Sequence, residues 1–237
     1  MSSETRTLDN VKDVILSAHM NLSPAEKVEF YNTWSENYDK DVSLLDYRAP
    51  LLAADLVSAH FPGERGAALV LDVACGTGLV AAEMKKHGFG RLVGLDGSKG
   101  MLQLATNTGL YEDVRQCMLG EDQLPVTWAG SFDVVLIVGA LSDGQVPACI
   151  AKELWKATKP GGLVCMTTRS NRDNVLYKAC LEQQLKLMED EGLWSRVTAT
   201  EVEEWERAVS ADEVGYIGGC VYIYRVSDVK PLCSPML

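Results

Sequence analysis

A glycine turn is the first candidate for chemistry in this sequence. The stretch LDVACGTGLVAAEM, residues 71–84, contains Gly76, Gly78 and Ala81, the G-x-G-x-x-[G/A] spacing of a dinucleotide-binding turn. Glycines let the backbone approach a ligand closely, and the start of a following helix offers free N–H groups. The spacing alone leaves open which nucleotide-bearing cofactor the turn holds.

Two aspartates narrow this choice. Asp72 lies four residues before Gly76, where a carboxylate would repel the pyrophosphate of NAD and attract a cofactor that carries an ammonium and a sulfonium. Asp96 follows Gly76 by 20 residues, at the end of the next predicted strand, where it can accept hydrogen bonds from both hydroxyls of a ribose. The plainer alternatives are an acid that binds the turn's own amides for Asp72 and a helix N-cap for Asp96. The charges favour S-adenosylmethionine, and an NAD-dependent oxidoreductase is the alternative.

The elements that must position these residues are short apolar runs separated by helix-like stretches. Such runs are typical of strands buried on both faces, and therefore of a parallel sheet covered by helices on both sides. We predict an α/β fold with three layers, doubly wound around a mostly parallel seven-stranded sheet. The first five strands are expected at 68–74, 91–96, 114–119, 132–141 and 162–168.

The C-terminal part should complete this sheet. A long amphipathic helix over 174–194 is followed by two β-rich runs, 195–209 and 215–226, with only a short polar link between them. So short a link permits an antiparallel pair but no parallel crossover, which predicts a reversed last strand at the edge of the sheet. Residues 160–162, Pro-Gly-Gly, are expected to stop the preceding helix and lead into the fifth strand.

The N-terminal part is predicted as a helical lid or appendage over residues 1–45, with 46–237 forming one cofactor-binding domain. Residues 23–26, Ser-Pro-Ala-Glu, have the composition of a capped helix start. The helix that they open carries aromatic residues at near-helical spacing, Trp34 and Tyr38 among them. This aromatic face either packs on the domain or closes over a ligand.

Taken together, these motifs resemble the class I S-adenosylmethionine-dependent methyltransferases. LDVACGTG resembles motif I of that family, VGLDGSKGMLQLA its second acidic motif, and LWKATKPGGLV its approach to strand five. The resemblance extends over roughly residues 28–226. It implies a Rossmann-like fold, S-adenosylmethionine as cofactor and methyl transfer as the reaction.

The resemblance also implies roles for individual residues. Asp72 would contact the methionine amino group, the turn would line the methionine and ribose moieties, and Asp96 would bind the ribose hydroxyls. Met101 would pack against the adenine, Met118 and Leu119 would give apolar and backbone contacts, and the aromatic helix would fold over the cofactor. The expected cofactor-binding residues are Trp34, Tyr38, Asp72, Ala74, Gly76, Thr77, Gly78, Asp96, Gly97, Ser98, Met101, Met118 and Leu119.

Two positions depart from the family pattern. Ala74 occupies a position that is often glycine in this family. Many relatives carry an acid just after strand three that accepts from the adenine amino group, whereas this chain has CMLGEDQLP with Glu121 and Asp122 close by. Which side chain meets the amino group is therefore left open.

No catalytic residue is assigned. Methyl transfer is a displacement at a carbon already activated by the sulfonium, so positioning supplies much of the catalysis. The [N/D]-P-P-[Y/F] tetrapeptide of many amine-modifying nucleic-acid methyltransferases is missing from VGALSDGQVP, residues 138–147. Asp143 is a candidate base, with Ser142 beside it, and Arg169 a candidate ligand for an acidic group, each against a plain surface role. We expect a small-molecule acceptor; a protein side chain, or a non-catalytic cofactor-binding module, are the alternatives.

Composition limits the partners further. The formal net charge of -11 disfavours a nucleic-acid partner, because that binding depends on Lys and Arg. The chain has no apolar run long enough for a membrane span and no signal-like N-terminus, so we expect a soluble cytoplasmic protein, most simply a monomer. Seven cysteines without a C-x-x-C pair indicate buried thiols in a reducing compartment, and His19, His60 and His87 lack ligand spacing, so no metal site is expected.

Overall fold

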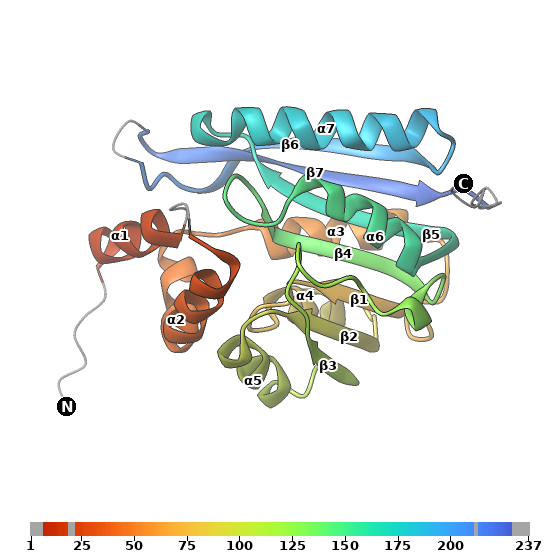
Figure 1. Ribbon diagram of the computed structural model, residues 1–237, viewed down its shortest axis with the longest axis horizontal. Helices are drawn as coiled ribbons and strands as arrows, with labels where there is room; N and C mark the ends of the chain where they lie inside the picture. Colours follow the sequence, from red (N-terminus) through yellow and green to blue (C-terminus); the bar gives the residue numbers. More distant parts are fainter. Residues whose placement is uncertain (1–6, 19–21, 211–212, 229–237) are drawn as a thin grey trace.

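The core of the fold is a seven-stranded sheet with strand order β3-β2-β1-β4-β5-β7-β6. The computed structural model describes residues 7–18, 22–210 and 213–228. Strands β1 to β5 run parallel, whereas β7 pairs antiparallel with both β5 and β6 (Figure 1). The predicted α/β class with a reversed last strand is confirmed. The strands are β1 (Leu69–Val73), β2 (Arg91–Asp96), β3 (Asp113–Gln116), β4 (Phe132–Leu141), β5 (Thr158–Arg169), β6 (Trp194–Arg207) and β7 (Tyr216–Val226).

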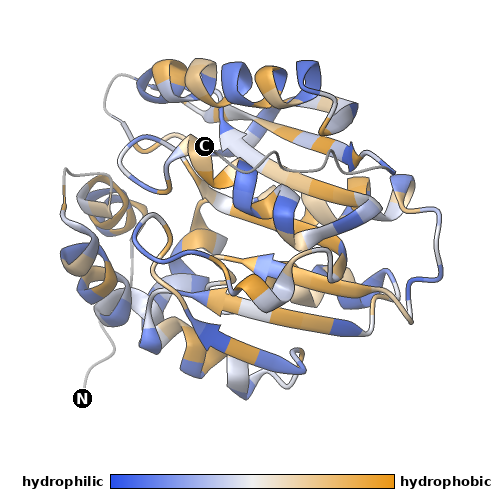
Figure 2. Ribbon diagram, turned by 45° about the vertical axis from the view of Figure 1, so that its right-hand side comes forward, coloured by the Kyte–Doolittle hydropathy of each residue, from blue (hydrophilic) through white to orange (hydrophobic). Residues whose placement is uncertain are grey.

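Helices cover both faces of this sheet. On one face, α3 (Ala49–His60) and α4 (Leu79–Lys86) share a buried cluster with β1, β4 and β7. On the other face, α6 (Ala151–Ala157) and α7 (Val175–Asp190) bury their apolar sides. Helix α5 (Lys99–Asn107) packs against β2 and β3. The apolar strands lie between polar outer helix surfaces, as the hydropathy colouring shows (Figure 2).

Three details of the predicted sheet are wrong. The edge strand is β6, because β7 is inserted between β5 and β6. Strand β7 is buried along most of its length, as an interior position requires, whereas β6 is largely exposed. Strand β3 ends at Gln116 and not at residue 119, and the residues that follow form a loop. Strand β5 begins at Thr158, and the Pro-Gly-Gly stretch lies within it, where the pairing with β4 shifts register.

Two N-terminal helices lie at the end of the sheet where the parallel strands terminate (Figure 1). They are α1 (Leu8–Ala18) and α2 (Pro24–Leu44). The predicted cap of α2 is present: the Ser23 side chain accepts from the Glu26 N–H, and the Glu26 carboxylate accepts from the Ser23 N–H at 2.8 Å. The aromatic side chains of α2 pack with the buried face of α1.

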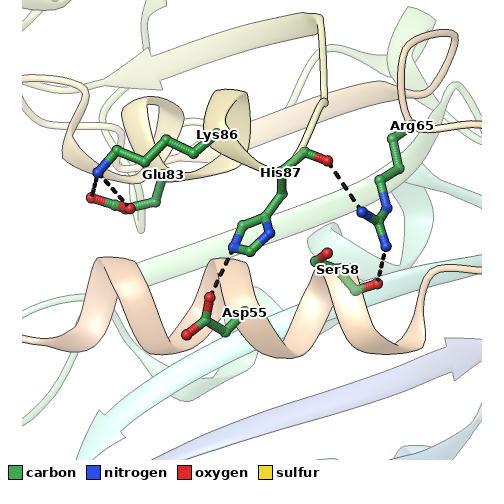
Figure 3. Close-up of polar contacts among 6 residues, drawn as sticks. All are labelled: Asp55, Ser58, Arg65, Glu83, Lys86 and His87. Atoms are coloured by element: carbon green, nitrogen blue, oxygen red, sulfur yellow. Dashed lines mark hydrogen bonds and ion pairs between the residues drawn. The ribbon is translucent and has the colours of Figure 1, made fainter.

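A polar network away from the strand ends ties α3 to the end of α4 (Figure 3). His87 Nε2 lies 2.8 Å from Asp55 Oδ1, and Arg65 donates to the carbonyls of Ser58 and His87. Lys86 forms an ion pair with Glu83 on the same helix. His87 is therefore a structural residue in this contact.

The remaining histidines and the cysteines lie at scattered positions in the described residues. His60 ends α3, and His19 lies outside the described residues. Cys75, Cys117, Cys165 and Cys220 are buried free thiols, Cys149 and Cys180 are exposed free thiols, and Cys233 lies outside the described residues. Within the described ranges, no group of three or more His, Cys, Asp or Glu side chains is arranged to hold a metal ion. No described helix is both long and apolar enough to cross a membrane.

Candidate functional site

A cavity of about 310 Å³, here called the larger cavity, opens where β1, β2 and β4 end. Open α/β sheets bind ligands at this end of their strands. Its walls come from the ends of β2 and β4, the β1–α4 and β2–α5 turns, the start of α5, the loops after β3 and β4, and α2. They are Ala74, Gly76, Asp96, Gly97, Ser98, Met101, Met118, Leu119, Gly120, Val138, Gly139, Ala140, Gln145, Val146, Pro147, Pro24, Lys27, Val28, Tyr31 and Tyr38.

The β1–α4 turn has the backbone conformation that its glycines suggest. Gly76 and Gly78 have φ values of +54° and +101°, and Ala74 also adopts a left-handed φ of +57°. A left-handed conformation costs a residue with a Cβ roughly 1–2 kcal/mol, so Ala74 accepts strain that glycine would avoid. At Gly78 a Cβ would come within 3.3 Å of the Tyr111 ring, so a side chain there is tightly restricted.

Asp96 organises the floor of the larger cavity. Its Oδ2 accepts from the Gly76 N–H at 2.9 Å, and its Oδ1 accepts from the Ser98 N–H at 2.8 Å. Burial raises the pKa of Asp96, while these backbone donors oppose that rise. Each carboxylate oxygen offers more than one acceptor site, so Asp96 can bind further hydroxyls on the cavity side.

The rest of the floor combines apolar side chains with a close backbone approach. Met101, Met118 and Leu119 supply the apolar surface. At Gly97 a Cβ would lie 3.3 Å from Val28 Cγ2 and 3.5 Å from Met118 Sδ, so a side chain would crowd this wall. The larger cavity therefore offers a carboxylate beside apolar side chains, as a nucleoside requires.

Four predicted residues do not line the larger cavity. Asp72 is completely buried in β1, where its Oδ2 accepts from the Tyr111 hydroxyl at 2.7 Å, and its Oδ1 has no hydrogen-bond partner. Burial raises the pKa of Asp72 to about 7. Thr77 and Gly78 shape the turn from behind, and Trp34 lies on a second cavity described below. The other nine predicted residues all line the larger cavity.

Helix α2 is fastened over the larger cavity. Asn32 Oδ1 accepts from the Ser98 hydroxyl at 2.7 Å and from the Gly100 N–H at 3.0 Å, and the Thr77 hydroxyl donates to Asp39 at 2.6 Å. A Cβ at Gly100 would lie 2.8 Å from a side-chain oxygen of α2 and 3.0 Å from the Asn32 carbonyl oxygen. This contact brings α2 close to α5, so α2 forms one wall of the cavity.

A second cavity of about 40 Å³, here called the smaller cavity, adjoins the larger one. The two share Tyr31, Tyr38, Gly139 and Gln145. The smaller cavity reaches under α1 and α2 toward β5 and β6. Its other walls are Ile15, Ala18, Trp34, Val42, Tyr47, Leu141, Ser142, Thr167, Thr168, Arg169, Trp205 and Glu206.

An ion pair lies in the wall of the smaller cavity. Arg169 Nε is 2.6 Å from Glu206 Oε1, and Glu206 is 2% exposed. Burial raises the pKa of Glu206, and the Arg169 charge opposes that rise. Burial also raises the pKa of Tyr31 to about 12, so its phenol stays protonated at neutral pH. Arg169 is thus a wall residue, whereas Asp143 is exposed and lines neither cavity.

The sequence reasoning missed Glu206. Two neighbouring strand residues, Trp205 and Glu206, are both buried, next to the place where the pairing of β6 with β7 shifts register. The available signal was the glycine pair inside the last predicted strand, since glycine within a strand often marks a close approach. At Gly219 a Cβ would lie 2.2 Å from the Trp205 ring.

Comparisons with known proteins agree with this geometry. A family model described as a methyltransferase domain matches residues 71–166. The chain is 50% identical over 200 residues to human methyltransferase-like protein 27, covering 84% of this chain and 81% of that protein. It is also 28% identical to the demethylmenaquinone methyltransferase of Lactococcus lactis, over 67% of this chain and 64% of the relative.

Solved structures show the same fold at low sequence identity. A SAM-dependent methyltransferase of Leishmania major matches with a TM-score of 0.63 and 14% identity, covering 90% of each chain. A putative methyltransferase of Haloferax volcanii, solved with its activator Trm112, matches with a TM-score of 0.60 and 20% identity, covering 83% of this chain and 97% of that one. The chain belongs to the S-adenosylmethionine-dependent methyltransferases.

Proposed function

We propose that the larger cavity binds S-adenosylmethionine and that the smaller cavity receives a small-molecule methyl acceptor. The observation that carries the first part is Asp96, a carboxylate fixed by two backbone N–H groups beside an apolar slot. Asp96 would hold the ribose hydroxyls, Met101, Met118 and Leu119 would flank the adenine, and the β1–α4 turn would line the methionine moiety. When bound, the cofactor supplies a methyl group activated by the sulfonium.

Asp72 has an indirect role in this proposal. Its carboxylate does not line the larger cavity, so it acts through its charge, behind the turn that lines the cavity. A cationic cofactor would favour the ionised form of Asp72, whose pKa is raised by burial. An anionic pyrophosphate in the same place would be repelled, which opposes NAD.

The shape of the smaller cavity supports a small-molecule acceptor. Its space of about 40 Å³ lies among side chains of α1 and α2, such as Ile15 and Trp34, so these helices border the reacting group. A protein side-chain acceptor would need a groove that admits a polypeptide. Relatives at 28% and 32% identity are named demethylmenaquinone methyltransferase and ubiquinone biosynthesis O-methyltransferase, names that refer to small molecules.

The N-terminal segment 1–45 is the lid of this site in our proposal. Within it, α2 supplies Lys27, Val28, Tyr31 and Tyr38 to the larger cavity, so the cofactor is covered by the chain once α2 is in place. Covering would exclude water from the transfer. The six free cysteines of the described residues fit our proposal of a reducing, cytoplasmic location.

Labelling of cell extract tests the acceptor class. Extract depleted of small molecules and complete extract are each incubated with the protein and methyl-tritiated S-adenosylmethionine. We expect label in small molecules, at a level that the Asp96→Asn variant does not reach. Label that enters only protein contradicts the small-molecule acceptor, and an absence of transfer beside normal cofactor binding supports a non-catalytic module.

A further inference from the structure

The smaller cavity contains polar groups that can take further hydrogen bonds. No hydroxyl of the described residues donates a hydrogen bond to Glu206, although this carboxylate is 2% exposed. The phenol oxygens of Tyr38 and Tyr47 make no hydrogen bond to any residue that the structure describes, and both side chains line the same cavity. By contrast, Thr167 Oγ1 accepts from the Gly139 N–H at 3.0 Å. The Glu206 carboxylate, whose partner is Arg169, and the two phenol groups therefore leave hydrogen-bonding capacity for a ligand in this cavity.

The sheet is locally irregular where the Glu206 carboxylate enters the wall of the smaller cavity. In a regular strand, Trp205 and Glu206 would point to opposite faces. The pairing of β6 with β7 shifts register between Val202 and Glu206, and an irregularity of this kind re-aims side chains. Trp205 then packs over Gly219 of β7, where any side chain would overlap its ring. The register shift of β6 and the glycine at position 219 therefore accompany the burial of Glu206 in the wall of the smaller cavity.

The charges of the pair discriminate between acceptor types. A carboxylate acceptor is already anionic and needs no base, so Glu206 would have no proton to take. An amine acceptor gains positive charge as it attacks, so the Arg169 cation has no developing anion to stabilise. A hydroxyl acceptor loses a proton while negative charge develops on its oxygen, and here Glu206 can take the proton while Arg169 stabilises the oxygen. The pair, with Nε and Oε1 2.6 Å apart, thus matches a hydroxyl best.

The other wall residues indicate what kind of molecule bears that hydroxyl. Tyr31, Trp34, Tyr38 and Tyr47 surround the smaller cavity with aromatic surface. The ring centroids of Trp34 and Tyr38 are 4.7 Å apart, so these side chains form one packed cluster. Aromatic walls favour a planar ring, which stacks or meets them edge to face.

We propose that the smaller cavity is the subsite for a phenolic hydroxyl and that Glu206 is the general base of the methyl transfer. This inference rests on the proposed function of the larger cavity. The acceptor oxygen forms the new bond to the methyl carbon, and the bond between that carbon and sulfur breaks with its electron pair passing to sulfur. The phenolic proton passes to the Glu206 carboxylate. Arg169 is a positioning residue that holds Glu206 and faces the developing oxyanion.

Binding of three matched probes tests the subsite without relying on turnover. The full chain, saturated with S-adenosylhomocysteine, is titrated by calorimetry with phenol, benzoate and benzylamine. We expect phenol to bind at least tenfold more tightly than either charged probe. Equal or tighter binding of benzoate or benzylamine, or no saturable binding of phenol, overturns the inference. Failure of S-adenosylhomocysteine and S-adenosylmethionine to bind would instead contradict the proposed function.

A variant pair tests the base. Glu206→Gln keeps the shape of the side chain, and Glu203→Gln changes an exposed glutamate of the same strand. With phenol and methyl-tritiated S-adenosylmethionine, Glu206→Gln should lower kcat about 100-fold or more with unchanged cofactor affinity, whereas Glu203→Gln should match the wild type. A rate within threefold of the wild type, or phenol bound by the wild type but never methylated, overturns the role of Glu206. Should Glu206→Gln fail to fold by circular dichroism, the three-probe titration of the wild type decides.

Discussion

Replacing Asp96 with asparagine is the sharpest perturbation of the larger cavity. Both carboxylate oxygens of Asp96 accept a backbone N–H, from Gly76 at 2.9 Å and from Ser98 at 2.8 Å. Asparagine keeps one acceptor oxygen, and its NH₂ group would face a second N–H donor. The substitution therefore removes the negative charge and disturbs the turn that the charge holds.

The size of the effect follows from these contacts. Hydrogen bonds to a charged group contribute about 1.5–3 kcal/mol each. Loss of the charge from two ribose hydrogen bonds should cost about 3 kcal/mol, or about a 100-fold increase in Kd. Calorimetric titration with S-adenosylmethionine measures this, with Asp143→Asn as the control because Asp143 is exposed and lines neither cavity. An Asp96→Asn variant that melts like the wild type and binds within threefold of it would refute the assignment.

Further predictions concern stability, the shared wall and the lid. Burial raises the pKa of Asp72 from 3.8 to about 7, so between these pH values the folded chain binds a proton that the unfolded chain lacks. Stability should fall as pH rises through this window, and Asp72→Asn should remove that slope of at most about 1.4 kcal/mol per pH unit in urea unfolding. A slope that is unchanged in the Asp72→Asn variant would contradict the raised pKa of Asp72 as the origin of this pH dependence. Gly139→Ala places a Cβ 2.2 Å from the Tyr47 hydroxyl and should weaken phenol binding at least tenfold, whereas Gly215→Ala, with φ +80° and open space, should not. Amide exchange in α2 should slow when S-adenosylmethionine binds. Gly100→Ala, which pushes α2 away from α5, should reduce that protection. Exchange in α2 that does not change on binding would contradict its role as a lid.

The part of the site that sequence could predict is the part built from local rules. The β1–α4 turn needs glycines at fixed positions, and Asp96 ends a strand of continuous apolar residues, so both features are visible in the chain. Met101 is predicted only through the resemblance to the methyltransferase family. These residues line the larger cavity together.

The residues that escaped prediction depend on long-range pairing. Glu206 becomes a wall residue where β6 shifts register against β7, and the local sign of this pairing is limited to the glycine pair in β7. Asp72 could be placed on β1, but its partner Tyr111 comes from 39 residues further along and takes its Oδ2 atom. The order of the last two strands is equally non-local, because it depends on which of them is buried on both faces.

The most direct test of the account is a calorimetric titration of the wild-type chain with S-adenosylmethionine and, separately, with NAD. The carboxylate of Asp96 beside an apolar slot, with the buried Asp72 behind the turn, predicts saturable binding of S-adenosylmethionine at one site per chain. It predicts no measurable binding of NAD under the same conditions. Binding of NAD without binding of S-adenosylmethionine would contradict the central claim.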